Sequence, residues 1–279
     1  MTLNCRGSLI DLTRRHAMAI VNLTPDSFYD GGKLKSDKDL LQRVETDLEA
    51  GATFLDLGGY SSRPGATDIC ETVETARVIQ AIVTVKREFP EALISIDTFR
   101  AAIAEKAVHA GACLINDISG GSRDKNMFQT VAKLRVPYIV MHMRGTPQTM
   151  QSLTGYKNLI QAVNLYFSER VNRLNALGVN DIILDPGFGF AKTTAQNYAL
   201  LKNLSLLYYN ELPILVGISR KSMVYKPLHS NADRALNATT AAHTLALQRG
   251  AAILRVHDVS EAMEAIKIFE AFESAGSLA

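Results

Sequence analysis

The chain has 279 residues, of which 47% are hydrophobic, enough for a large buried core. Its formal net charge of +2 gives no global field toward nucleic acid or a membrane, so an anion would have to be bound by local groups. Three cysteines without a CxxC pair argue against a disulfide framework, and the lack of a long apolar run argues against a membrane span; we expect a soluble cytoplasmic protein.

Eight short apolar runs recur along the chain, and each is followed by a loop and an amphipathic stretch. They predict strands at 17–22, 53–57, 93–97, 113–117, 138–143, 181–185, 213–217 and 252–256. Between them, stretches such as DKDLLQRVETDLEAGA and AAIAEKAVHAGA place apolar residues at three- and four-residue spacing, which indicates helices. Strands that alternate with helices are typical of parallel strands joined by crossovers.

The number and spacing of these units predict one α/β domain over residues 1–279, a (β/α)₈ TIM barrel. From Asn22 to Arg255 the repeat averages roughly 33 residues, close to the unit of a barrel of about 250 residues. No Pro/Ser-rich linker or low-complexity tract divides the sequence. An open doubly wound sheet would need fewer units and usually has a glycine fingerprint after its first strand, which is absent here.

A polar residue stands at or just beyond the end of every predicted strand. These residues are Asn22, Asp56, Asp97, Asn116, His142, Asp185, the pair Ser219 and Lys221, and the pair Arg255 and His257. In a barrel such positions converge on one rim, where catalytic residues lie. A single polar strand end is commonly a turn residue, but eight of them indicate a site.

The rim residues divide into acceptors and cations. The three aspartates and Asn116 suit a flat heterocycle with amino and ring N–H groups, because a buried carboxylate needs donors. The cations expected to bind an anion are Arg63, Lys221, Arg255 and His257. Asn22 offers an amide oxygen that magnesium accepts beside water and phosphate oxygens, although a lone Asn is more often a turn cap.

Three loops and two histidines need a separate interpretation. The stretch DLGGYSSRPGA at 56–66 is either a surface turn or a mobile part of a site for an anion. The glycines of DPGFGF at 185–190 allow a ligand to approach the backbone, and its phenylalanines can flank a flat ring. The charges in GISRKSM are often only a solvated turn. His109 and His243 fall in helical stretches, where we expect surface or interface positions, and no zinc spacing or nucleotide phosphate loop occurs.

The segments VNLTPDSF, DLGGYSSRPGA, SIDTFR, INDISGG, DPGFGF, GISRKS and RVHDV together resemble the dihydropteroate synthase family in order and barrel position. The resemblance implies an enzyme of folate synthesis that joins 6-hydroxymethyl-7,8-dihydropterin diphosphate to 4-aminobenzoate with the help of magnesium (Mg2+). The products would be 7,8-dihydropteroate and diphosphate. It also implies a homodimer that associates through outer helices and a target of sulfonamides.

The same resemblance implies a role for individual positions. Residues that match the pterin site are Asp97, Asn116, Asp185 and Lys221. Residues that match the diphosphate site are Arg255, His257 and Asn22, of which Asn22 would touch magnesium. Residues expected around 4-aminobenzoate are Ser62, Arg63, Pro64, Phe190, Lys221 and Ser222, with Phe28 and Asp30 of an earlier loop closing over it. We expect the catalytic residues to be Asp97, Asp185, Lys221 and Arg63.

Two residues depart from the family's usual GGESTRPG, and two other functions stay open. Tyr60 stands where Glu is usual, and Ser62 stands where Thr is usual, which keeps the hydroxyl but removes a methyl group. A pterin-binding methyltransferase barrel would share the acceptors but would not need SRPG or SRKS. A non-catalytic pterin-binding paralogue would not need the full set of cations, and Tyr60 leaves some room for it.

Overall fold

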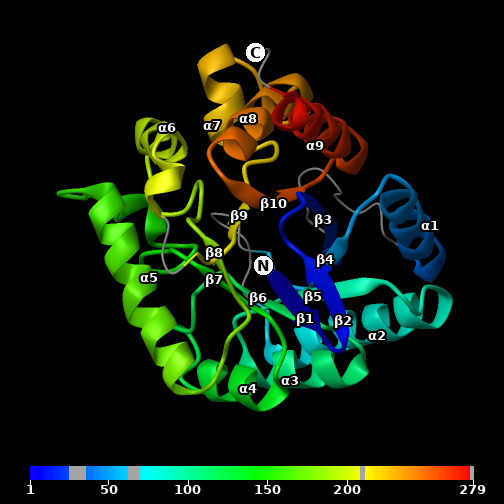
Figure 1. The fold of residues 1–279 in the computed structure, drawn as a ribbon. Coiled ribbons are helices and arrows are strands. Elements are labelled where there is room, and N and C mark those ends of the chain that lie inside the picture. The colour runs from blue at the N-terminus through cyan, green and yellow to red at the C-terminus, as the bar shows by residue number, and fades with distance from the viewer. Residues whose placement is uncertain (25–35, 62–68, 208–210, 277–279) are drawn as a thin grey trace.

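The computed structural model describes residues 1–24, 36–61, 69–207 and 211–276. Eight parallel strands close into a barrel in the order β10-β3-β4-β5-β6-β7-β8-β9. Helices alternate with the strands and surround the barrel (Figure 1). The predicted (β/α)₈ barrel is therefore confirmed.

The predicted strands agree with the observed ones to within two residues at each end. The barrel strands are β3 (His16–Asn22), β4 (Phe54–Gly58), β5 (Leu93–Asp97), β6 (Leu114–Asp117), β7 (Tyr138–Met141), β8 (Ile182–Asp185), β9 (Ile214–Val216) and β10 (Ala251–Val256). The α-helices are α1 (Asp37–Glu49), α2 (Glu71–Glu88), α3 (Ala101–Ala110), α4 (Met127–Leu134), α5 (Leu159–Ala176), α6 (Thr194–Lys202), α7 (Ser222–Tyr225), α8 (Leu236–Gln248) and α9 (Val259–Ser274). Short 3-10 helices lie at Met150–Ser152, Leu204–Leu207 and Lys226–Leu228.

An antiparallel hairpin that the sequence analysis did not predict precedes the barrel. It consists of β1 (Thr2–Cys5) and β2 (Ser8–Asp11), joined by Arg6 and Gly7. Both turn residues have positive φ, 55° and 100°, which matches the twist of a tight hairpin. Figure 1 shows the hairpin lying across one end of the barrel, where its buried side chains join those of the barrel interior.

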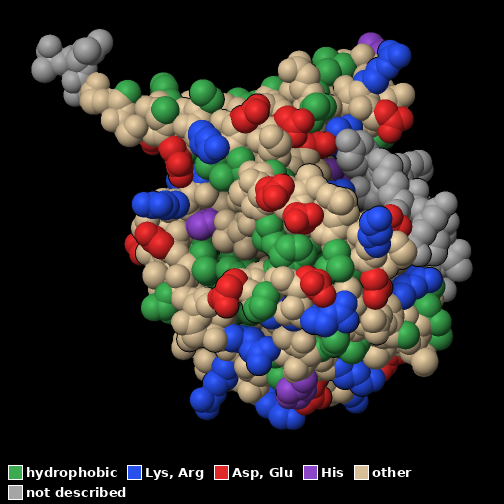
Figure 2. Space-filling view, turned by 90° about the vertical axis from the view of Figure 1, so that its right-hand side faces the viewer, with side chains coloured by type: hydrophobic (Ala, Val, Ile, Leu, Met, Phe, Trp, Pro, Cys, Tyr) green, Lys and Arg blue, Asp and Glu red, His purple; other side chains and the backbone are tan. Residues whose placement is uncertain are grey.

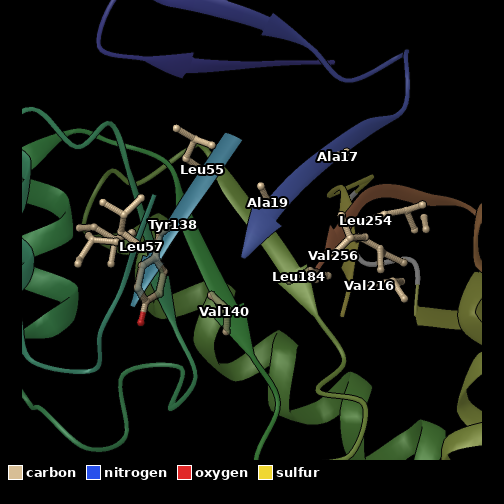
Figure 3. Packing of buried hydrophobic residues seen from close by; sticks show 14 of the residues in the cluster. Ala17, Ala19, Leu55, Leu57, Tyr138, Val140, Leu184, Val216, Leu254 and Val256 are labelled. Atoms are coloured by element: carbon tan, nitrogen blue, oxygen red, sulfur yellow. The ribbon is translucent and has the colours of Figure 1, made fainter. Parts of the chain in front are cut away.

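Side chains of the barrel strands alternate between the surrounding helices and the interior. The helix-facing residues labelled in Figure 3 are Ala17, Ala19, Leu55, Leu57, Tyr138, Val140, Leu184, Val216, Leu254 and Val256. The interior residues that pack with the hairpin include Met18, Phe54, Leu114, Ile139, Ile183, Leu215 and Ile253. This apolar plug fills the N-terminal half of the barrel.

The interior becomes polar one layer further along the strands. Two residues beyond Phe54, Leu114, Ile183 and Ile253 stand Asp56, Asn116, Asp185 and Arg255. They share the inward face because strand side chains repeat with a period of two. The carboxyl ends of the strands therefore carry a polar ring above an apolar plug.

The surface carries both charge signs, and the cysteines are unpaired. On the face in Figure 2, basic and acidic side chains are interspersed, as the small net charge predicts. Cys5 and Cys113 are buried and Cys70 is exposed, all as free thiols. Within the described parts of the chain, no helix is both long and apolar enough to span a membrane.

Candidate active site

The centre of the polar ring is an arginine held between two carboxylates. Arg255 Nε donates to Asp56 Oδ2 at 2.6 Å, and Arg255 Nη2 donates to Asp97 Oδ2 at 2.8 Å. Asn116 Nδ2 donates to the same Asp56 oxygen at 2.9 Å. These contacts join the ends of β4, β5, β6 and β10, so the ring is organised before any ligand arrives.

Two buried oxygens of this ring receive no hydrogen bond from the described residues. They are Asp56 Oδ1 and Asn116 Oδ1. Leaving a buried acceptor unpaired costs about 1–3 kcal/mol, so such atoms are common where a ligand supplies the donor. The pair therefore offers a preformed position for the N–H groups of a bound molecule.

Asp185 and Lys221 form the opposite side of the ring. Asp185 Oδ1 accepts from the backbone N–H of Gly187 at 2.7 Å. Lys221 Nζ donates to the carbonyl of Phe188 at 2.6 Å and lies 4.8 Å from the centre of the Phe190 ring. Lys221 thus reaches from the end of β9 to the loop that follows β8.

Burial perturbs the ionisation of these groups. It raises the pKa of Asp97 to about 7, although the Arg255 charge opposes that change. Burial also raises the pKa of Asp185, opposed chiefly by Lys221, and lowers the pKa of Lys221 to about 8, opposed by Asp185. Strongly perturbed groups gathered in one place are typical of a functional site.

An apolar collar lies beyond the polar ring. We use this name for Tyr60, Phe99, Ile118, Met141, Met143, Met150 and Ala191, with the partly buried Phe190 and Ile69 packed against them. Phe99 and Ile118 follow Asp97 and Asn116 by two residues. A flat ring could therefore place its edge on the polar ring and its faces against the collar.

Tyr60, the departure from the family pattern, belongs to this collar. Its ring meets Phe99 edge-on at 5.0 Å between centroids, and the Arg100 guanidinium lies 5.6 Å from the Tyr60 ring centre. Arg100 forms an ion pair with Glu74, whose side chain is buried. The Tyr60 ring therefore packs in the apolar collar beside Phe99 and Arg100.

The residues expected around diphosphate lie on adjacent strands, since β10 pairs with β3. Asn22 ends β3, and His257 follows β10 with its Nδ1 3.1 Å from Ser219 Oγ. Burial, and then the Arg255 charge, lower the pKa of His257 to about 3. With such a pKa the imidazole carries no charge at pH 7 when the site holds no anion.

Arg220 is neither solvated nor part of a simple turn. It is buried, its Nε and Nη2 each donate to an Asp258 oxygen at 2.8 Å, and its Nη1 donates to the carbonyls of Ala232 and Asp233. This clamp holds the segment before Lys221 against the start of α9. The alternative of a solvated turn for GISRKSM is therefore wrong.

His243 does not lie on the surface, the first of the two positions predicted for it. It is buried on α8, its Nε2 has no hydrogen-bond partner among the described residues, and burial lowers its pKa to about 4. Its neighbours Ala242, Ala246 and Leu247 are buried as well. The apolar content of TAAHTLALQRG was a sequence signal for a helix that packs against the barrel.

The structure brings together most of the predicted site residues but not all of them. Asp97, Asn116, Asp185, Lys221 and Arg255 form one group, with Phe190 beside Lys221 and Ser222 at the start of α7. Phe28, Asp30, Ser62, Arg63 and Pro64 lie outside the described residues. Asp56 was predicted only as an acceptor for a flat heterocycle; in the structure its Oδ2 also accepts from Asn116 and Arg255.

The comparisons with known proteins agree on one family. The family model described as "Pterin binding enzyme" matches residues 18–257. The dihydropteroate synthase of Escherichia coli K12 is 39% identical over 277 residues, which cover 99% of this chain and 98% of that protein.

Two solved structures are similar over almost the whole chain. The Yersinia pestis dihydropteroate synthase in a sulfonamide drug complex is 42% identical with a TM-score of 0.95, and covers 99% of this chain and 100% of its own. The Xanthomonas albilineans dihydropteroate synthase in complex with 7,8-dihydropteroate is 33% identical with a TM-score of 0.87, at the same coverage.

Proposed function

This chain belongs to the dihydropteroate synthases among the pterin-binding enzymes, and we propose that its polar ring and collar carry out their condensation. It is a transferase of folate synthesis. The substrates would be 6-hydroxymethyl-7,8-dihydropterin diphosphate and 4-aminobenzoate, and the products 7,8-dihydropteroate and diphosphate. One observation carries the proposal: unpaired buried acceptors and perturbed carboxylates lie directly below an apolar collar.

The pterin would enter with its nitrogen-rich edge toward the plug. Its amino and ring N–H groups would donate to Asn116 Oδ1 and to the Asp97 and Asp185 carboxylates. Lys221 Nζ would donate to an acceptor on the ring, leaving the Phe188 carbonyl that it contacts in this structure. The collar would cover the faces of the ring and exclude water from its edge.

The diphosphate would lie toward β3 and β10. Two carboxylates hold Arg255 in place, and its guanidinium would lie beside the leaving group. His257 would contribute as a neutral hydrogen-bonding group, and an approaching diphosphate would raise the pKa of the imidazole.

Asn22 fits a magnesium ion only as one ligand of several. Its amide oxygen is a hard donor, and the described residues hold no cluster of three or more His, Cys, Asp or Glu side chains for a metal. The remaining ligands would be diphosphate oxygens and water. Magnesium would supply neutralisation of the diphosphate charge, which improves the leaving group.

The chemistry then needs electrostatic support more than a strong base. The bond between the pterin methylene and diphosphate breaks, and the positive charge spreads over the electron-rich ring. Asp97 and Asp185, held against the ring, stabilise that charge; the loss of one such partner commonly costs roughly 10²–10³ in rate. The aniline nitrogen of 4-aminobenzoate attacks the methylene and loses its proton afterwards.

The loop residues expected around 4-aminobenzoate belong to the same proposal. Arg63, with Ser62 and Pro64, and Phe28 with Asp30 would surround the second substrate next to Phe190 and Lys221. A sulfonamide would compete with 4-aminobenzoate there, since the Yersinia pestis relative forms a complex with a sulfonamide drug.

A cytoplasmic homodimer completes the proposal. The buried free thiols of Cys5 and Cys113 suit a reducing compartment. Large apolar side chains are exposed on the last two helices, at Leu245 of α8 and at Ile268 and Phe272 of α9. Ile268 and Phe272 are one helical turn apart, so both lie on one side of α9, which a second copy would cover.

The test is release of diphosphate by the purified protein from the pterin diphosphate in the presence of magnesium. We expect release that requires 4-aminobenzoate and forms 7,8-dihydropteroate in equal amount. A methyltransferase or a non-catalytic paralogue would bind the pterin without this product, and that result would overturn the proposed function.

A further inference from the structure

A buried lysine and histidine lie beside the polar ring without a role so far. His142 follows β7 as one of the rim residues of the sequence analysis, and Lys192 precedes α6. Both are buried. Lys192 Nζ lies 3.0 Å from His142 Nδ1, so a charged Lys192 requires the imidazole proton on Nε2.

Lys192 also binds the loop that carries Asp185. Its Nζ donates to the carbonyls of Gly187 at 2.9 Å and Phe190 at 3.0 Å. All three donors of the ammonium group are therefore used inside the protein. None of them goes to a carboxylate, which is an uncommon arrangement for a buried charge.

Further contacts hold the same loop near both of its ends. The N–H of His142 donates to the carbonyl of Asp185 at 2.8 Å. Gly187 has φ +67°, and a Cβ there would lie 2.1 Å from the His142 carbonyl oxygen, so no side chain fits. At the far end, Thr193 and Gln196 form a capping box that begins α6 directly after Lys192.

Several charged side chains among the described residues face Lys192, His142 and Asp185. Lys192 faces Asp185, Lys221 and Arg144; burial lowers its pKa to about 7. His142 faces Lys192, Arg144 and Arg170. Burial is the main cause that lowers the pKa of His142 to about 2, and these three charges add to it, so the imidazole is neutral. Asp185 in turn faces Lys221, Arg255 and Lys192, each of which favours its ionised form.

The geometry points to Lys192, with His142, as a positioning pair that holds the 185–190 loop and keeps Asp185 placed and ionised for the pterin. The inference rests on the proposed function. Lys192 itself would touch no substrate: it acts through Asp185 and Phe190. Its loss would therefore affect binding of the pterin more than the integrity of the barrel.

The test compares Lys192→Met with Lys202→Met, the same change at an exposed lysine of the neighbouring helix α6. Titration calorimetry with 6-hydroxymethylpterin measures binding, and the pH profile of kcat/KM for the pterin diphosphate reports ionisation. We expect Lys192→Met to bind about tenfold to a hundredfold more weakly, since small displacements of a site have effects of that size. We also expect the acid limb of its kcat/KM profile to move to higher pH. Loss of the cation near Asp185 would raise the pKa of that carboxyl.

Lys202→Met should leave both measurements unchanged. If Lys192→Met does not fold by circular dichroism, His142→Leu carries the same test because it removes the Nδ1 acceptor. A folded variant with unchanged pterin affinity and an unchanged acid limb would overturn the inference, even if its melting temperature fell. Failure of the wild-type protein to bind the pterin would instead count against the proposed function.

Discussion

The position of each residue along its strand decides its role in this site. Asp56 and Phe54 share the inward face of β4, yet Phe54 closes the plug while Asp56 anchors Arg255 and Asn116. The sequence analysis separated the rim residues into acceptors and cations from residue type, and the structure brings Asp97, Asn116 and Asp185 to the same polar ring. The two groups also contact each other, because folding brings Arg255 to carboxylates 199 and 158 positions away. Sequence spacing carries no signal of such a contact.

Asp185→Asn tests the acceptor edge of the ring. The amide oxygen of the variant can keep the bond from the Gly187 N–H, but its NH₂ group then faces the donors of the pterin. We expect pterin affinity to fall by about 1–3 kcal/mol, roughly tenfold to a hundredfold, measured by calorimetry with 6-hydroxymethylpterin. Asp181→Asn, four residues earlier at the plug end of the barrel, is the control. Unchanged affinity of the Asp185 variant would remove Asp185 from the pterin site.

His243→Leu tests the cost of a buried titratable group away from the site. The folded-state pKa of about 4 lies below the ordinary 6.5, so the unfolded chain binds the extra proton between these values. The contribution of His243 to stability is thus present above pH 6.5 and is lost as pH falls toward 4. As the pH falls from 7.5 to 5, we expect the free energy of unfolding of the leucine variant to rise by roughly 2 kcal/mol relative to that of the wild type. Urea unfolding at the two pH values measures the gain, and a pH-independent difference would contradict it.

At the scale of elements, the strands were predictable because parallel barrel strands are buried on both faces and form continuous apolar runs. AMAIVN and DIILD are clear examples. The β1–β2 hairpin was not predictable in this way, since its strands have four residues and TLNC buries only Leu3 and Cys5. The hairpin packs over the open N-terminal end of the barrel, where it buries Phe54, Met18 and their neighbours. This packing surface forms only when the barrel has folded, so no local sequence pattern reveals it.

Leu3→Ala tests whether the hairpin is part of the core. Leu3 is 2% exposed within the plug, so truncation should lower the free energy of unfolding by about 2–5 kcal/mol. Leu9→Ala, in the same hairpin at 69% exposure, should change it by no more than about 0.5 kcal/mol. Pterin affinity should stay the same in both variants, because the plug separates the hairpin from the polar ring. Equal unfolding midpoints in urea for the two variants would show that the hairpin is only loosely attached.

At the scale of the whole molecule, stability and chemistry occupy opposite ends of one barrel. The apolar plug and the hairpin close the N-terminal end, while unpaired acceptors, buried cations and perturbed carboxylates gather at the carboxyl ends of the strands. This division follows from parallel strands, which point all their ends the same way. It also leaves the outer helices free to take part in assembly.

The proposed homodimer is tested on the outer face of α9. Ile268 and Phe272 are 71% and 67% exposed, and burying two such side chains in a dimer would contribute about 3–6 kcal/mol. The double variant Ile268→Asp/Phe272→Asp removes that gain and adds two charges that the interface would have to desolvate. We expect sedimentation equilibrium to show a dimer for the wild type and a monomer with an unchanged circular dichroism spectrum for the variant. Leu165→Asp, at a 59% exposed position of α5, adds one aspartate to a different outer helix and should remain dimeric. A monomeric wild type, or a double variant that still dimerises, would place the interface elsewhere or nowhere.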